Sequence, residues 1–184
     1  MTEIPELLSS RVIYRGPVFD VRTDEVQYAD GKTHDVDIVD HRGSYAIIAT
    51  TSDDRIVLVQ QYRHAARRAL WEIPAGRAEE EDARAGALRE LQEETGYRAS
   101  SMRLLGSMLM TPGFCNEILH FFHASGLREG EQDLDPDERI SVASFTLEEA
   151  ERLVATGQIA DAKTLISLMW LRGPRSELVP GSSR

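Results

Sequence analysis

The sequence predicts a protein of the α/β class, in which a long run of strands precedes the first helix. Three observations support this prediction. Up to residue 64, β-branched and aromatic residues form short runs separated by turn-forming groups such as "ADGK". After the Pro-Gly break in "IPAG", apolar residues recur at helical spacing. Near the C-terminus, a capping-box pattern opens a further helical stretch.

The first half of the chain contains several expected strands and one helix. "ADGK" predicts a hairpin, and the apolar runs "YAIIAT" and "IVLVQQY" predict central strands that are buried on both faces. A short strand and the Pro-Gly break lead into a helix that ends at Gly96, where a left-handed cap is expected. The buried stripe of this helix is formed by Ala83, Ala87, Leu88 and Leu91.

Strands resume after this helix, and two helices follow them. "MRLLGSMLM" and "EILHFFHASG" are expected strands, "LREGEQDLDPDERI" is an expected exposed loop, and "SVASF" is the last strand. Thr146 as N-cap and Glu149 three residues later predict the start of the next helix. "DAKTLISLMWL" is the final helix, and the tail 173–184 has no apolar period, so no ordered structure is expected there.

Composition and charge limit the classes of function. The chain of 184 residues is 41% hydrophobic and 28% charged, which is ordinary for a globular protein. Its apolar runs are too short to span a bilayer, and its start does not resemble a signal peptide. One cysteine excludes an intrachain disulfide and favours a reducing, cytoplasmic location. The net charge of −10 disfavours nucleic acid, but a divalent cation can still bring in a phosphorylated small molecule.

The stretch "LRELQEETGY" places three glutamates in one predicted helix. Glu90, Glu93 and Glu94 lie at i, i+3 and i+4, so their carboxylates are expected to project from one face. Carboxylate oxygens are ligands that Mg²⁺ and Mn²⁺ prefer. The alternative is a solvated acidic face, and the three glutamates alone do not decide between the two interpretations.

The surrounding residues resemble the Nudix box. Glu81 lies eight residues before Arg89, and "RELQEETGY" follows in the order that the box requires. Gly76 is one residue too close to Glu81, a difference confined to the loop. Beyond the box, "QYRHAARRALWEIPAG", "TPGFCNE" and "GQIADAKTLISL" resemble the branch of ADP-ribose and other NDP-sugar pyrophosphatases.

The resemblance implies a fold, a domain organisation and an activity. The fold is an α/β/α sandwich with a mixed sheet, formed by a Nudix domain at 44–172. A β-rich segment at 1–43 precedes it and is expected to form a homodimer. The implied activity is metal-dependent hydrolysis of the pyrophosphate in NDP-sugars, with ADP-ribose giving AMP and ribose 5-phosphate. GDP-mannose or another NDP-sugar is an alternative substrate, and a ligand-sensing Nudix module without catalysis is an alternative role.

The resemblance also implies roles for individual residues. Glu90, Glu93, Glu94 and the carbonyl of Ala75 would bind Mg²⁺, for which Mn²⁺ can substitute. Arg89 and Glu81 would orient the helix against the loop. Glu93 and Arg89 are expected catalytic residues. The general base would come from the acidic loop, with Glu138 in the favoured position. The expected substrate contacts are Arg63, for which a surface ion pair is the alternative, Glu79, Gly113 and Glu117.

Overall fold

The computed structural model describes residues 3–79, 82–136 and 138–173. Its contacts divide the chain into two compact units, which are treated separately below. One comprises Met1–Gly43 and Met108–Leu119, and the other comprises Ser44–Ser107 and His120–Arg184. Residues 174–184 of the predicted tail lie outside the described residues. No described helix has both the length and the apolar character needed to cross a membrane.

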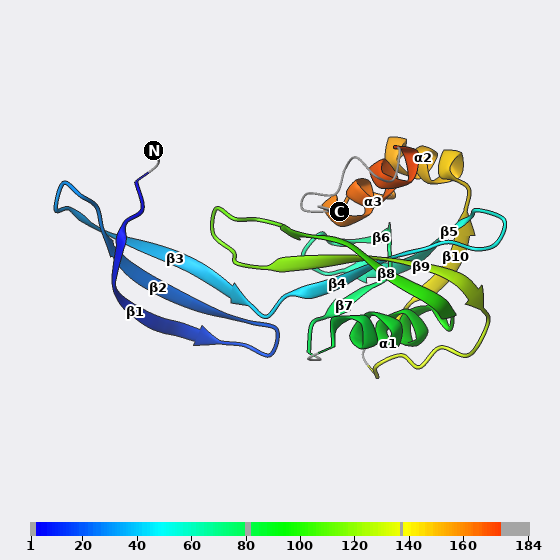
Figure 1. The fold of residues 1–184 in the computed structure, drawn as a ribbon, viewed down its shortest axis with the longest axis horizontal. Helices are drawn as coiled ribbons and strands as arrows, with labels where there is room; N and C mark the ends of the chain where they lie inside the picture. The colour runs from blue at the N-terminus through cyan, green and yellow to red at the C-terminus, as the bar shows by residue number, and fades with distance from the viewer. Residues whose placement is uncertain (1–2, 80–81, 137, 174–184) are drawn as a thin grey trace. The chain divides into compact units, whose positions relative to one another are not determined.

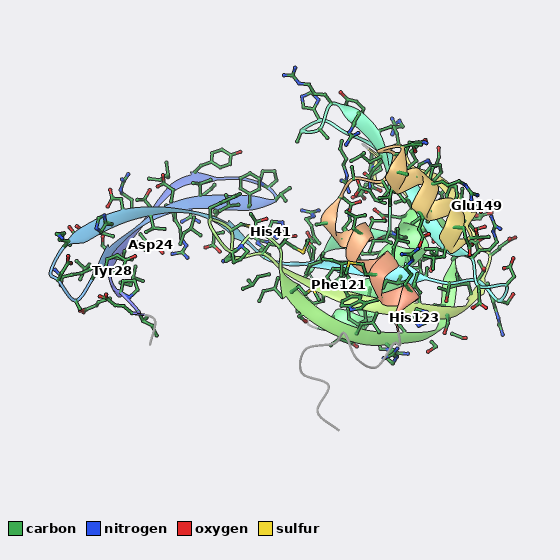
Figure 2. The ribbon with its side chains drawn as sticks, turned by 90° about the horizontal axis from the view of Figure 1, so that it is seen from above. Asp24, Tyr28, His41, Phe121, His123 and Glu149 are labelled. Atoms are coloured by element: carbon green, nitrogen blue, oxygen red, sulfur yellow. The ribbon has the colours of Figure 1, made fainter. Side chains whose placement is uncertain are left out.

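The first unit is built on an antiparallel sheet of three strands. These are β1 (Glu6–Arg15), β2 (Phe19–Gln27) and β3 (Thr33–His41), in the order β1-β2-β3 (Figure 1). Gly31 adopts a φ of 80° in the turn between β2 and β3, which confirms the hairpin predicted from "ADGK". Asp24 of β2 is buried and binds the Ser10 hydroxyl at 2.6 Å, which ties β1 to β2 (Figure 2).

The unit extends beyond the predicted segment 1–43, because residues 108–119 join it. Val39 N donates to the Phe114 carbonyl at 2.8 Å, and the Asn116 side chain accepts from His41 N at 2.7 Å. The same amide donates to Asp40 Oδ1 at 2.6 Å. These contacts join β3 to the connection between two later strands, a pairing between distant segments that local sequence patterns do not predict.

The second unit contains two sheets and three helices. One sheet has the order β10-β5-β6, with β10 (Ser141–Phe145), β5 (Ile56–Arg63) and β6 (Arg68–Glu72). The other has the order β7-β4-β9-β8, with β7 (Ala75–Arg77), β4 (Ser44–Ala49), β9 (Ile118–Arg128) and β8 (Arg98–Leu109). Figure 1 shows α1 (Ala83–Thr95) on one side of these strands, with α2 (Leu147–Ala155) and α3 (Ala162–Arg172) on the other. This layering confirms the predicted α/β sandwich.

The core of this unit lies between the strands and the helices. Residues 45–49 of β4 and 56–59 of β5 are buried, as the apolar runs predicted. The prediction fails for the end of β5, where Gln60 and Gln61 are partly buried and Tyr62 is exposed. Ala87 and Leu91 of α1 are buried against Tyr45, Ile47 and other residues of this core, while Ala83 and Leu88 pack at its edge. Each large apolar side chain buried in this way contributes about 1.5–3 kcal/mol to folding. On the other side, Phe121 of β9 packs edge-on against Trp170 of α3 at 4.8 Å (Figure 2).

The two predicted caps, Gly96 and the capping box at Thr146, are present, and Asp82 forms a further cap that was not predicted. At α1, Asp82 accepts hydrogen bonds from the N–H groups of Arg84 and Ala85, and Gly96 closes the helix with a φ of 74°. At α2, Thr146 and Glu149 form the predicted capping box. Glu149 also binds Arg55 at 2.9 Å, which ties the start of α2 to the strands beneath it (Figure 2).

Candidate functional site

Arg89 lies between two of the three glutamates on α1. Its Nη2 is 2.6 Å from Glu90 Oε1, and its Nη1 binds Glu93 Oε2 one turn further along the helix. Both carboxylates are partly buried, with side-chain exposures of 13% for Glu90 and 30% for Glu93. One guanidinium therefore offsets the repulsion between the two carboxylates and fixes their orientation.

Glu94 differs from the other two glutamates because it points into the protein. Only 3% of it is exposed, on the same side of α1 as Ala87 and Leu91. Its Oε2 accepts a hydrogen bond from Ala75 N at 2.9 Å. Burial raises the pKa of Glu94 to about 8, and the charges of Glu90 and Glu138 act in the same direction. Glu94 is i+4 from Glu90, and the two carboxylates lie at the adjacent residues Ala75 and Gly76, so burial of Glu94 does not move it to another face. What the sequence did not predict is that Glu94 is buried rather than exposed to solvent.

Strand β7 brings the loop before α1 against the glutamates. Ala75 and Gly76 pair with Ala46 and Tyr45 of β4, which fixes the backbone of the loop. A side chain at Gly76 would overlap the Glu90 carboxylate, since an added Cβ would fall on its carboxyl atoms. Gly76 therefore makes room for Glu90, although it lies one residue out of register with the box that the sequence resembles.

The donor atoms at this junction fit a divalent cation in kind. In the described ranges, no group of three or more His, Cys, Asp or Glu side chains is arranged to hold a metal ion. Glu90 and Glu93 bind Arg89 instead, and Glu94 binds the Ala75 N–H. Glu94 is nevertheless a buried carboxylate close to other negative charges, and its pKa is raised for that reason. A bound divalent cation would offset the repulsion between these charges. The ligand set of Glu90, Glu93, Glu94 and the Ala75 carbonyl stays a prediction.

The acidic loop is attached to the C-terminal end of α1. Gln132 Nε2 donates to the Glu94 carbonyl at 2.6 Å, and Asp133 N donates to the Glu93 carbonyl at 3.1 Å. Gly96 and Gly130 allow the two backbones to approach, because a Cβ on Gly96 would lie 2.8 Å from the Gly130 carbonyl oxygen. Sequence reasoning missed Gln132. Its position inside an acidic loop gave no signal of a contact with a helix end.

Glu138, the predicted base, lies in electrostatic reach of Glu94. Its charge is one of the causes that raise the pKa of Glu94. The side chain accepts a hydrogen bond from Asp135 N at 3.1 Å, and Glu138 N donates to the Asp135 carbonyl at 2.9 Å. Asp137, another acidic residue of this loop, lies outside the described residues. The role of Glu138 stays a prediction.

Arg63 binds a buried carboxylate of its own sheet. Its Nε and Nη2 contact the two oxygens of Glu72 at 2.8 and 2.7 Å. The Glu72 side chain is 2% exposed and that of Arg63 is 41% exposed, so the guanidinium keeps a solvent-facing side. The bidentate pair raises the pKa of Arg63, which also feels the charge of Glu94. Sequence analysis left two roles open for Arg63, a phosphate contact or a surface ion pair. The structure contains an ion pair, but its carboxylate partner Glu72 is buried.

The other predicted residues are distributed over both units. Glu79 is half-exposed and forms an ion pair with Arg77 at 3.1 Å, while Glu81 lies outside the described residues. Gly113 and Glu117 belong to the first unit, whereas the glutamates of α1 belong to the second. Glu117 lies 3.8 Å from His41, and a Cβ on Gly113 would meet open space. Their roles in substrate binding stay predictions.

Two protein families match the chain. The NUDIX domain matches residues 40–168, and the nucleoside diphosphate sugar hydrolase N-terminal domain matches residues 6–36. A solved structure described as an ADP compounds hydrolase superposes with a TM-score of 0.81 over 94% of both chains. At 19% sequence identity, this likeness shows the fold alone.

Named relatives match the chain over most of its length. A methanol dehydrogenase activator of Bacillus methanolicus is 40% identical over 90% of this chain and 91% of the relative. An ADP-ribose pyrophosphatase of Bacillus subtilis is 38% identical over the same shares. A GDP-mannose pyrophosphatase of Klebsiella pneumoniae is 31% identical over 88% of this chain and 86% of the relative. The chain belongs to the Nudix hydrolase family.

Proposed function

We propose that the protein is a metal-dependent hydrolase that cleaves the pyrophosphate of nucleoside diphosphate sugars, with ADP-ribose as the preferred substrate. The observation that carries the proposal is the junction of α1 with β7. There, Glu94 is buried with a raised pKa, and Glu90 packs against Gly76. The match to an N-terminal domain of nucleoside diphosphate sugar hydrolases supports the substrate class.

The acidic side chains at this junction would hold the cation. Glu90, Glu93 and Glu94, with the Ala75 carbonyl, supply hard oxygen donors of the kind that Mg²⁺ prefers, and Mn²⁺ accepts the same donors. A bound divalent cation offsets the charge of the diphosphate and polarises the phosphorus under attack. Arg89 keeps Glu90 and Glu93 in a fixed orientation.

Two further side chains, Glu138 and Arg63, carry the remaining steps of the proposed reaction. Glu138 takes a proton from the attacking water, which becomes bonded to one phosphorus while the bridging oxygen leaves with the other phosphate. Arg63 binds a phosphate oxygen with N–H groups that Glu72 does not use, since a guanidinium has five donors and Glu72 occupies two. ADP-ribose and water then give AMP and ribose 5-phosphate.

A panel of substrates tests the proposal and its alternatives. ADP-ribose, GDP-mannose and other NDP-sugars are incubated with the protein and Mg²⁺ or Mn²⁺, and the nucleoside monophosphate and sugar phosphate are quantified. Metal-dependent cleavage of ADP-ribose with the highest kcat/KM supports the proposal. A higher kcat/KM for GDP-mannose would move the substrate to the alternative that the Klebsiella pneumoniae relative suggests. Binding without cleavage of any compound would favour a ligand-sensing module.

We further propose that the protein is a homodimer formed through the N-terminal sheet. All ten residues of β1 are exposed, and apolar side chains are among them, with exposures of 56% for Leu7 and 51% for Ile13. A sheet with exposed apolar side chains is stable when another layer covers it, and a second copy can supply that layer. Light scattering at micromolar concentration tests this: twice the chain mass supports the dimer, and a monomer contradicts it.

A cytoplasmic location stays a prediction, which the single cysteine favours.

A further inference from the structure

The segment before α3 runs alongside β6. Arg68 Nη1 donates to the Gly157 carbonyl at 3.0 Å, and Trp71 N donates to the Gln158 carbonyl at 2.9 Å. The stretch "GQIADAKT" therefore follows "RALWEI" in order, although nearly 90 residues separate the two in the sequence. The contacts continue to Glu72, the last residue of β6, and to Ile73 after it, which both bind the first turn of α3.

Lys163 is the second cation on the buried Glu72. Its Nζ binds Glu72 Oε2 and lies 2.9 Å from Oδ1 of Asp161, the N-cap of α3. A buried carboxylate is costly unless cations and hydrogen bonds compensate it. Burial alone would raise the pKa of Glu72, but the contacts with Arg63 and Lys163 outweigh burial and lower it. Glu72 is therefore an ionised link between Arg63 and α3.

Thr164 makes a second link, to the backbone. Its Oγ1 accepts a hydrogen bond from Ile73 N at 3.0 Å, and the Thr164 side chain is fully buried. Ile73 leads through one proline to Ala75, whose N–H binds Glu94. The first turn of α3 thus reaches towards Glu94 by two routes, through Glu72 to Arg63 and through Ile73 to Ala75.

We propose that Lys163 and Thr164 are positioning residues, which hold Arg63 and Ala75 in place for the reaction without touching substrate. The inference rests on the proposed function. The side-chain exposures support it: Arg63 is 41% exposed and can reach a ligand from solvent, whereas Lys163 is only 14% exposed. Lys163 also shares the charge of Glu72, so that Arg63 keeps donors for a phosphate while Glu72 stays compensated.

Steady-state kinetics on three variants tests the proposal. Lys163→Met removes the cation at nearly constant length, Thr164→Val removes the acceptor at nearly constant shape, and Arg172→Met removes an exposed cation from the far end of α3 as a control. We expect Lys163→Met to raise KM for ADP-ribose about tenfold or more, with kcat within about threefold, because a misplaced binding group weakens substrate contacts. Lys163→Arg should recover most of this loss. Arg172→Met should change neither parameter.

The backbone route has its own readout. We expect Thr164→Val to lower kcat and to speed hydrogen exchange of the Ile73 amide by about tenfold or more, since that N–H loses its buried acceptor. Arg172→Met should leave the exchange of this amide unchanged. Exchange at the wild-type rate in Thr164→Val would overturn the second link.

The outcomes separate this inference from the proposed function. If Lys163→Met lowers stability but leaves KM unchanged, Lys163 has a structural role only and the inference is wrong. If the wild-type protein hydrolyses no NDP-sugar, the proposed function fails, and the Nε–H NMR signal of Arg63 then tests the positioning alone. That signal should shift in metal-free Lys163→Met and not in Arg172→Met. An unchanged signal in Lys163→Met would overturn the inference whatever the substrate.

Discussion

Replacing Gly76 by alanine would test how the loop before α1 accommodates Glu90. Gly76 is not among the glycines with a positive φ, so alanine fits its backbone. The added methyl group would occupy the place of the Glu90 carboxylate. The end of a flexible side chain can move away, so the cost in folding free energy should be about 1 kcal/mol, the lower end of the range for overpacking. The carboxylate itself must shift by about 1 Å or more, and a shift of that size costs about 10²-fold in rate.

The assay is kcat for ADP-ribose as a function of Mg²⁺ concentration, with urea unfolding as a measure of stability. Gly76→Ala should lower kcat by about 10²-fold while the protein stays folded. The same substitution in a Glu90→Ala background should add little, because the group that the methyl displaces is gone. Near wild-type kcat in Gly76→Ala, or an equal further loss in both backgrounds, would refute the assignment of Gly76 as the residue that makes room for Glu90.

Three further predictions concern the acidic loop, the helix end and the buried carboxylate. Glu138→Gln should lower kcat by about 10²–10⁴-fold with KM almost unchanged. Asp133→Asn and Asp135→Asn should cost little, and a uniform small loss across the three variants would contradict a single base. Gly96→Ala should lower the free energy of unfolding by about 1–2 kcal/mol from the left-handed backbone alone, and contact with the Gly130 carbonyl should add to this loss; an unchanged urea midpoint would contradict it. Because the folded-state pKa of Glu72 is lowered from 4.5, its stabilising effect is present above that pH and is lost as the pH falls below it. In Glu72→Gln, the free energy of unfolding should fall less steeply as the pH is lowered below 4.5. An equally steep fall in the variant would argue against an ionised Glu72 between Arg63 and Lys163.

Features that depend on local sequence were predictable. The capping box of Thr146 and Glu149 and the left-handed Gly96 need only residues within one turn, and both occur as expected. The burial of β4 and of the first four residues of β5 was predictable because these apolar runs have no polar face. These features fix the order of the elements and place the glutamates on α1.

Features that depend on distant contacts were not predictable in the same way. The burial of Glu94 had a signal, because Glu94 continues the spacing of Ala87 and Leu91, but a glutamate is rarely buried and the acidic grouping favoured an exposed face. The contact of Lys163 with Glu72 had no signal, since it joins residues 91 positions apart. Sequence patterns predict which face of a helix or strand is apolar. They do not predict which charged residues, far apart in the sequence, form ion pairs.

The most direct test of the central claim is ADP-ribose hydrolysis by the wild-type protein and by Glu94→Gln at saturating Mg²⁺, with AMP and ribose 5-phosphate quantified. Glutamine keeps the shape of the side chain and an oxygen that can accept from Ala75 N, but it removes the negative charge that the cation requires. The wild-type protein should release the two products in equal amounts, and Glu94→Gln should stay folded while kcat falls by about 10²-fold or more. Near wild-type turnover in Glu94→Gln would contradict the claim that the buried carboxylate of α1 holds the catalytic metal.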